Sequence, residues 1–344
     1  MKKIISLPSS NLVIKGDIVS YIKENIGAIL NNKDLNVTLK KFATGFYQQT
    51  VLLTLHNFND QQVVLKKSVK LSKFSSQQLK ECLALLKQKG LQIADITSDE
   101  IKYNDDKFLL WKYIEPTRIS NLADLDQMIL KFWQGTSQVS INSDQNLPKF
   151  TILDELRNYG NVFADPKILN YFPDQECVAT YRKWIDYFLR PEFKQKYEQL
   201  PKFYAHRDLT PGNIIVKNQD AFLIDWDYAN IDTRLADIIR PFGFFGIREQ
   251  LNPNTGKKTY HSDPTNLLAK INYFQSEIEK SPFKMTQIEK ELFPQIALLS
   301  VILDACEDLK YHIQGKTALG FVRSKVLTLW GSMKIFIKAN NLNV

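Results

Sequence analysis

Short apolar or alternating runs dominate the first third of the chain and predict strands. Each run is rich in β-branched or aromatic residues, which pack well on a pleated surface. The runs are residues 35–42, 50–56, 62–69 and 107–116, the last ending at Pro116. The polar segment NFND between the second and third runs is a turn signal, whereas the first and second are joined by ATGFYQQ, which carries a single Gly45.

Two segments of the same third have helical spacing instead. Residues 17–30 place apolar side chains on one helical face, and residues 75–90 do the same. Ser75 or Ser76 can cap the second helix, and Gly90 can end it. We therefore expect a strand-rich region in which one helix follows the third strand.

From about residue 120 the apolar spacing becomes helical almost throughout. The helical stretches are 122–139, 175–200, 266–280, 285–314 and 321–340. This shift in pattern near residue 115 predicts an α+β protein with a small lobe over 1–115 and a larger, mostly helical lobe over 116–344.

One stretch interrupts the helical pattern: YAHRDLTPGNIIVKNQDAFLIDWDYAN, residues 204–230. Its short apolar runs are separated by the polar loop RDLTPG and by KNQD, which predicts a loop followed by a β-hairpin with KNQD as its turn. Asp208, Asn213 and Asp225 then fall at strand ends. Because the second strand returns to the end where the first begins, all three side chains can reach one site.

Two carboxylates and an amide oxygen at one site suit a hard divalent cation such as magnesium, with a base beside it. Any single aspartate of the stretch could instead satisfy the backbone of a turn. The joint pattern is more specific: His-x-Asp-x4-Asn, a hairpin, then an apolar residue before Ile-Asp. It favours a site that performs chemistry.

Composition and charge exclude some classes of protein. Hydrophobic residues make up 44% and charged residues 24% of the chain, which is ordinary for a globular protein. The net charge of +8 is spread along the sequence without a block of five or six basic residues. We therefore expect no nucleic-acid partner.

The three cysteines, Cys82, Cys177 and Cys306, are far apart and odd in number, which fits neither a disulfide framework nor a zinc site. They indicate a reducing compartment. The apolar run IISL near the start is too short for a signal peptide, and no stretch is long enough for a membrane span. We expect a cytoplasmic protein that does not bind membranes.

The motifs HRDLTPGN and LIDWD resemble the catalytic and metal-binding loops of the kinase-like small-molecule phosphotransferases, which include aminoglycoside phosphotransferases, choline kinases and homoserine kinases. The resemblance implies a bilobal protein-kinase-like fold with an antiparallel sheet in the small lobe. It implies that Asp208 is the catalytic base or positions the acceptor hydroxyl, and that Asn213 and Asp225 hold magnesium on the phosphates of ATP.

The same resemblance implies roles for residues of the first lobe. Lys66 in VVLKK matches the lysine that pairs with phosphates, and Glu81 matches the helix glutamate that pairs with this lysine. The segment LLWKYIEP resembles the hinge, where the backbone from Lys112 to Ile114 would meet the adenine. Each could instead be ordinary: a solvated lysine, an exposed helix charge, and core residues.

Three further residues of the motif region have implied roles. His206 matches a histidine that braces the catalytic loop rather than a base, and Asp237 matches an aspartate that ties this loop down. Asp227 either approaches a second metal ion or orders its loop, and the sequence favours neither.

Departures from the pattern narrow the substrate class. Residue 207 is Arg, where many small-molecule kinases have glycine or another small residue. The glycine of a DFG motif is missing after Asp225, and no activation loop ending in APE follows. These absences argue against a protein substrate. Within the superfamily, the spacing looks nearest to CotS-type spore-coat-kinase-like proteins.

We therefore expect an ATP-dependent, magnesium-requiring kinase that phosphorylates a hydroxyl group of a small molecule. Residues 242–263 are a candidate lid or acceptor loop. Asp304, Glu307 and Asp308 could meet a cationic acceptor or form a solvated helix face. Two alternatives stay open: a kinase-like scaffold or coat protein without catalysis, and an antibiotic kinase. The pattern does not distinguish ATP from GTP and indicates no oligomeric state.

Overall fold

The structure is a computed structural model that describes most of the chain. The described residues are 36–41, 50–56, 61–67, 74–103, 106–139, 141, 149–172, 175–251, 258–315 and 319–343. The predicted helix over 17–30, the turn NFND and the link with Gly45 lie outside them. Contacts divide the chain into two compact units, one of Met1–Leu71 with Ile93–Thr117 and one of Ser72–Gln92 with Arg118–Val344.

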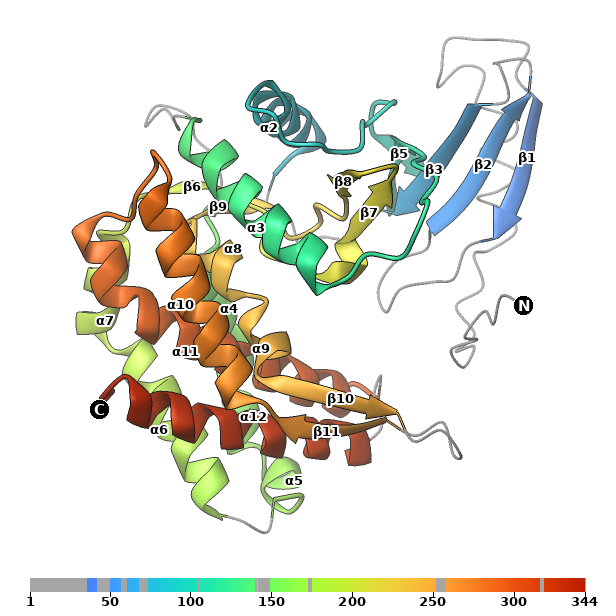
Figure 1. Cartoon of the computed structure of the whole chain (residues 1–344). Coiled ribbons are helices and arrows are strands. Elements are labelled where there is room, and N and C mark those ends of the chain that lie inside the picture. The colour runs from blue at the N-terminus through green and yellow to red at the C-terminus, as the bar shows by residue number, and fades with distance from the viewer. Residues whose placement is uncertain are drawn as a thin grey trace. The chain divides into compact units, whose positions relative to one another are not determined.

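The first unit contains a five-stranded antiparallel sheet (Figure 1). Its strands, in spatial order, are β1 (Asn36–Lys41), β2 (Thr50–His56), β3 (Gln61–Lys67), β5 (Asp106–Lys112) and β4 (Ile101–Tyr103). All but β4 were predicted from the sequence. On β3, Val63 and Leu65 are buried on one face, as a period of two requires.

The helix α2 (Ser76–Gln88) begins and ends where its sequence indicates. Ser75 and Gln78 form a capping box at its start. Gly90 follows its end with a φ of +87°, and the N–H groups of Gly90 and Leu91 return to carbonyls of the last turn. By its contacts α2 belongs to the second unit, so a lobe boundary near residue 115 stays a prediction.

The second unit is mainly helical. Its longer helices are α3 (Leu122–Ser137), α4 (Ile152–Tyr159), α6 (Gln175–Leu189), α7 (Pro191–Glu198), α10 (Pro264–Lys280), α11 (Gln287–Ile313) and α12 (Leu319–Ala339). The shorter ones are η1 (Gly160–Ala164), α5 (Pro166–Leu169), η2 (Pro211–Asn213), α8 (Leu235–Ile239) and α9 (Phe242–Phe245). The predicted helical stretch 175–200 divides at Pro191, which starts α7 because its missing N–H costs nothing in a first turn. The sequence analysis did not predict α4, η1 or α5.

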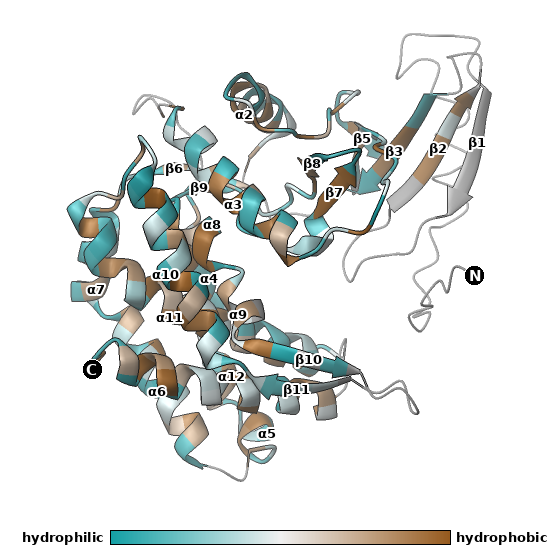
Figure 2. Ribbon diagram, in the orientation of Figure 1, coloured by the Kyte–Doolittle hydropathy of each residue, from teal (hydrophilic) through white to brown (hydrophobic). Residues whose placement is uncertain are grey.

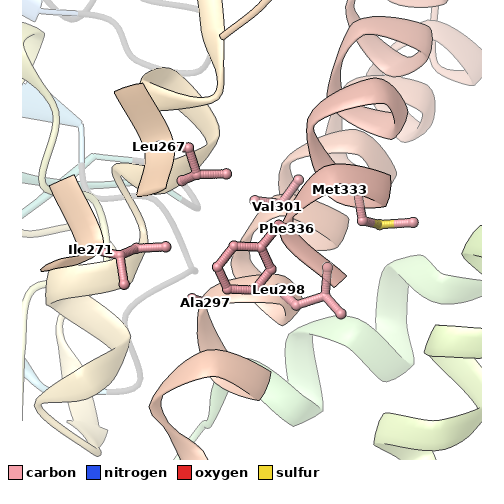
Figure 3. A pocket seen from close by; sticks show the side chains of 7 residues that line it. All are labelled: Leu267, Ile271, Ala297, Leu298, Val301, Met333 and Phe336. Carbon is pink, nitrogen blue, oxygen red and sulfur yellow. The ribbon is translucent and has the colours of Figure 1, made fainter. Parts of the chain in front are cut away.

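Helix α11 is the centre of this unit, and about half of its residues are buried. It packs on α12, α8 and α4, and these helices carry both apolar and polar residues (Figure 2). An apolar hollow without room for a water molecule remains between α10, α11 and α12 (Figure 3). Its lining residues are Leu267, Ile271, Ala297, Leu298, Val301, Met333 and Phe336. Because its wall is apolar, the hollow is a packing gap and not a polar site.

Three two-stranded antiparallel sheets complete the unit. They are β6 (Phe203–Ala205) with β9 (Asn230–Asp232), β7 (Ile214–Lys217) with β8 (Asp220–Leu223), and β10 (Ile247–Leu251) with β11 (Lys258–Ser262). Among the described residues, none of the helices is long and apolar enough to span a bilayer.

Candidate active site

The β7–β8 hairpin brings the two ends of the sequence motif together. Ile214 pairs with Leu223, and the N–H of Ile224 donates to the carbonyl of Asn213 at 2.9 Å. Asn213 and Asp225 therefore flank the same end of the hairpin. At the other end Lys217 pairs with Asp220, which confirms the predicted turn at KNQD.

Asp208 lies in the loop between β6 and η2 and is tied directly to Asn213. The amide Nδ2 of Asn213 donates to the backbone carbonyl of Asp208 at 2.8 Å and to its Oδ2 at 2.7 Å. Because both contacts use the nitrogen, the Oδ1 of Asn213 accepts no hydrogen bond from the described residues and is available as a ligand.

The carboxyl group of Asp208 titrates above its ordinary range. Burial raises the pKa of Asp208 to about 6, and the nearby charge of Asp225 also raises it. Arg240 and the hydrogen bond from Asn213 act in the opposite direction. Its remaining oxygen, Oδ1, accepts no hydrogen bond from the described residues. A base with a pKa near neutral pH is suited to accept a proton from an alcohol.

His206 stabilises this loop through a ring contact and two hydrogen bonds. Its ring is buried and packs against Trp226, with 4.7 Å between ring centroids. Its Nδ1 accepts the backbone N–H of Asp208 at 3.2 Å, and its Nε2 lies 2.9 Å from the carbonyl of Ile224. The amide donor assigns the proton to Nε2, which donates to Ile224, so this histidine has no nitrogen left to act as a base.

Asp237 on α8 binds the backbone of the same loop. Its two oxygens accept the N–H groups of His206 at 3.0 Å and of Arg207 at 2.5 Å. Burial raises the pKa of Asp237 to about 7, while those two hydrogen bonds partly offset the rise. Its contacts are those of a residue that orders the loop.

Arg207 was noticed in the sequence only as a departure from the family pattern. In the structure its side chain is buried and forms an ion pair with Glu155 of α4. Its backbone has a φ of +65°, in the left-handed region that favours glycine. Sequence reasoning missed Glu155, because a lone glutamate 52 residues upstream has no spacing that marks it.

The other predicted residues lie in both units. Asp227, two residues after Asp225, is buried, and Lys66 on β3 is buried within the first unit. Glu81 on α2 is exposed and accepts a hydrogen bond from Nε2 of Gln77 at 2.8 Å. Because Lys66 and Glu81 belong to different units, their pairing stays a prediction.

The predicted hinge begins within β5 and continues past its end at Lys112. The N–H of Lys112 donates to Asp95 at 2.7 Å, and the N–H of Tyr113 donates to Gln62 at 3.2 Å. Among the described residues the N–H of Ile114 has no such partner. A contact of this segment with adenine stays a prediction.

The acids on α11 are half-buried and paired, in contrast to a solvated helix face. Arg240 donates to Glu307 at 2.5 Å, and Nζ of Lys325 lies 2.6 Å from Asp308 and 3.1 Å from Asp304. Burial raises the pKa of Glu307 to about 7. Arg240 interacts electrostatically with Asp208 as well as with Glu307 and Asp304. The charge of this arginine therefore links the acids on α11 to the loop that carries Asp208.

The oxygens at the hairpin end fit a magnesium ion that is shared with a nucleotide. Asn213 Oδ1 and the carboxylate of Asp225 are hard ligands of the kind that magnesium prefers. In the described part of the chain, no group of three or more His, Cys, Asp and Glu side chains could hold a metal ion. The ion would therefore take its remaining ligands from phosphate and water, as magnesium does in kinases.

Comparison with known proteins identifies the class. Residues 38–264 match the family model of the phosphotransferase enzyme family, and the chain belongs to that family. It is therefore a phosphotransferase. No curated protein sequence matches the chain.

Solved structures agree on the fold. A choline kinase from Cryptosporidium parvum Iowa II is 13% identical with a TM-score of 0.60, and the match covers 95% of this chain and 97% of that one. The choline kinase LicA from Streptococcus pneumoniae is 16% identical with a TM-score of 0.56, covering 92% and 99%. A thermostable mutant of aminoglycoside phosphotransferase APH(4)-Ia, in a complex with ADP and hygromycin B, is 10% identical with a TM-score of 0.57, covering 94% and 99%. The fold is thus the protein-kinase-like α+β fold.

Proposed function

We propose that this protein transfers the γ-phosphoryl group of ATP to a hydroxyl group of a small molecule, with Asp208 as the base. The observation that supports this most directly is the contact between Asp208 and Asn213 at the hairpin end that also carries Asp225. The second oxygen of Asp208, Oδ1, accepts no hydrogen bond from the described residues and would receive the proton of the acceptor hydroxyl.

The other residues are assigned to the nucleotide. Asn213 and Asp225, with Asp227 as a further candidate, would hold magnesium, which supplies charge neutralisation on the phosphates. Lys66, paired with Glu81, would contact the phosphates, and the backbone of Lys112 and Ile114 would contact adenine. ADP in the complex of APH(4)-Ia supports a nucleotide in this fold.

We further propose that the acceptor carries a positive charge. Arg240 lies among four carboxylates, those of Asp208, Glu155, Glu307 and Asp304. Arg207 pairs with Glu155 and Lys325 with Asp304, so three cations face these four carboxylates. The raised pKa of Glu307 indicates that Arg240 does not fully offset the cost of burying this carboxylate. An amino alcohol would supply the missing charge. The names of choline and aminoglycoside kinases with this fold agree with such an acceptor.

Residues 242–263 are assigned to the acceptor side. Both ends of the segment are bonded to α12: Ser332 donates to the carbonyl of Gly246 at 2.6 Å, and Ser262 donates to that of Thr328 at 2.7 Å. Anchored ends suit a hairpin that borders a binding site.

A screen of ATP consumption tests the proposal. The purified protein is given ATP, magnesium and a panel of amino alcohols, aminoglycosides, hydroxy amino acids and neutral sugars, and products are identified by mass spectrometry. We expect one amino alcohol to be phosphorylated, with loss of activity when magnesium is chelated. Phosphorylation of neutral sugars alone would contradict the charge assignment but not the kinase assignment.

The alternative is a kinase-like scaffold or coat-associated protein, to which the resemblance to CotS-type proteins would point. A thermal-shift measurement separates the two, because a ligand that binds only the folded state raises Tm. We expect millimolar ATP with magnesium to raise Tm, and absence of any shift would favour the scaffold. The three buried free thiols agree with a cytoplasmic setting.

A further inference from the structure

Arg207 combines two features that are unfavourable separately. Its φ of +65° is uncommon for a residue with a side chain, and its guanidinium is almost fully buried, with 1% of the side chain exposed. A buried cation needs partners, and a left-handed backbone persists only where the surroundings hold it. Both features occur at the residue that precedes Asp208.

The partners of the guanidinium come from outside the catalytic loop. Its Nη2 donates to Oε2 of Glu155, its Nη1 donates to the carbonyl of Phe150, and its Nε lies 3.8 Å from Oδ2 of Asp232. Asp232 is itself held by the hydroxyl of Tyr197 at 2.5 Å. Glu155 provides the one close carboxylate contact in this set.

Glu155 has no competing hydrogen bond among the described residues. Its second oxygen, Oε1, is buried without a hydrogen-bond partner and lies 3.8 Å from Nη1 of Arg240. The carboxylate of Glu155 therefore lies between Arg207 and Arg240 but, of the residues that the structure describes, forms a hydrogen bond only with Arg207. Loss of its charge would leave Arg207 with Asp232, at 3.8 Å, as its nearest carboxylate.

The loop also has backbone hydrogen bonds to Asp237 and His206. Asp237 accepts the N–H of Arg207, and His206 accepts the N–H of Asp208. The second bond depends on the left-handed conformation of residue 207, because the φ and ψ of this residue set the direction of the next peptide, which carries the N–H of Asp208. Protection of the N–H groups of Arg207 and Asp208 therefore measures whether the loop keeps this geometry.

We propose that Glu155 is a positioning residue for Asp208, acting through Arg207. The ion pair between Glu155 and the guanidinium keeps residue 207 at positive φ. This backbone conformation in turn orients the carboxylate of Asp208. Its effect on phosphoryl transfer rests on the proposed function, whereas its effect on the loop does not.

If the ion pair serves to hold residue 207 at positive φ, a glycine at this position can replace it. Glycine adopts positive φ without strain and carries no charge to compensate. A chain with glycine at position 207 should therefore not need Glu155. This predicts that Arg207→Gly restores the loop geometry at residues 207 and 208 that Glu155→Gln loses. Recovery of stability alone would follow for any buried ion pair, because removing Arg207 also removes the uncompensated charge.

The test compares Glu155→Gln, Arg207→Lys and the double variant Glu155→Gln/Arg207→Gly with the wild type. The matched control is Glu289→Gln. Glu289 also bonds a buried arginine, Arg234, at 2.8 Å, but it lies at the start of α11, and no hydrogen bond within the described part of the chain joins this pair to residues 206–208. The first readout is hydrogen–deuterium exchange of the amides at 207 and 208, which needs no activity. The second is kcat and KM for the acceptor that the screen identifies.

We expect Glu155→Gln and Arg207→Lys to lose protection at both amides and to lower kcat by about 100-fold, as a misaimed base does, with a smaller change in KM. The double variant should regain protection and most of kcat, and Glu289→Gln should lower Tm while leaving both readouts unchanged. Protection retained in Glu155→Gln, or the same loss in the double variant, would overturn the proposal. If Glu155→Gln does not fold, the double variant decides, because the proposal requires it to fold with protected amides.

Discussion

Gly243 shows how a single residue sets the approach of two helices. In α9 it faces Asp304 of α11 so closely that an added Cβ would lie 2.7 Å from Oδ2 of Asp304. The same carboxylate is 3.1 Å from Nζ of Lys325. The absence of a side chain at position 243 therefore preserves an ion pair at the acceptor side of the proposed site.

Replacing Gly243 by alanine should displace Asp304 and destabilise the fold by about 1–3 kcal/mol, because the added methyl overpacks a buried contact. Thermal unfolding of Gly243→Ala measures this loss. The control is Gly320→Ala in α12, where an added Cβ meets nothing within 4 Å, so Tm should stay the same or rise slightly. A Gly243→Ala variant as stable as Gly320→Ala would contradict the packing argument.

Individual site residues could be predicted from the sequence where they form a local motif. Asp208, Asn213 and Asp225 lie within 18 residues and could be selected together, and their placement at one hairpin end follows from the strand pattern. Glu155 could not be selected, because its importance depends on a contact made in three dimensions. The pairing of Lys66 with Glu81 stays a prediction.

Among the elements, α4 carries the residue that the sequence analysis missed. The helix has only eight residues, too few for a helical period to stand out, and it starts after residues that carry no pattern. Its start is nevertheless well defined: Thr151 accepts the N–H of Asp154, and Asp154 accepts the N–H of Thr151. The longer helices α10, α11 and α12 were predicted because several turns repeat the same spacing.

Removing the cap of α4 should be measurable. Thr151→Ala deletes one half of the capping box and should cost about 1 kcal/mol of stability, seen as a drop in Tm of about 1–2 °C. Thr151→Ser retains a hydroxyl and serves as the control. A Tm for Thr151→Ala equal to that of Thr151→Ser would show that the cap contributes nothing.

Length also determined which strands could be predicted from the sequence. β1, β2, β3 and β5 each have six or seven residues and an apolar or alternating pattern. β4 has three residues and leaves no period to detect. Its position at the sheet edge depends on pairing with β5, which the sequence of β4 alone does not encode.

At the scale of the whole molecule, several buried carboxyl groups have raised pKa values. Burial raises the pKa of Asp237 and Glu307 to about 7 and of Asp308 to about 6. For such groups the folded state binds protons more tightly than the unfolded state, so stability falls as pH rises through the folded-state pKa. The lowered pKa of Asp124 and of Asp154 affects only more acidic solutions.

Glu307 allows this effect to be isolated. We expect the stability of the wild type, relative to Glu307→Gln, to fall from about pH 5 to about pH 7 and to level off above that, because over this range Glu307 is protonated mainly in the folded state and glutamine does not titrate. The measurement is urea unfolding of both proteins at several pH values, and the difference cancels the contribution of groups common to both. A difference that is constant across this range would contradict a raised pKa for Glu307.

The central claim, that Asp208 is the base of a phosphotransferase, is tested most directly by one comparison. The rate of phosphorylated product formation is measured for the wild type, Asp208→Asn and Asp220→Asn, with binding of ATP and magnesium measured in parallel. Asp220 is exposed at the hairpin turn and serves as the matched control. We predict that Asp208→Asn loses about 100-fold or more in rate while still binding ATP, and that Asp220→Asn is unchanged. Equal rates for Asp208→Asn and the wild type would contradict the account.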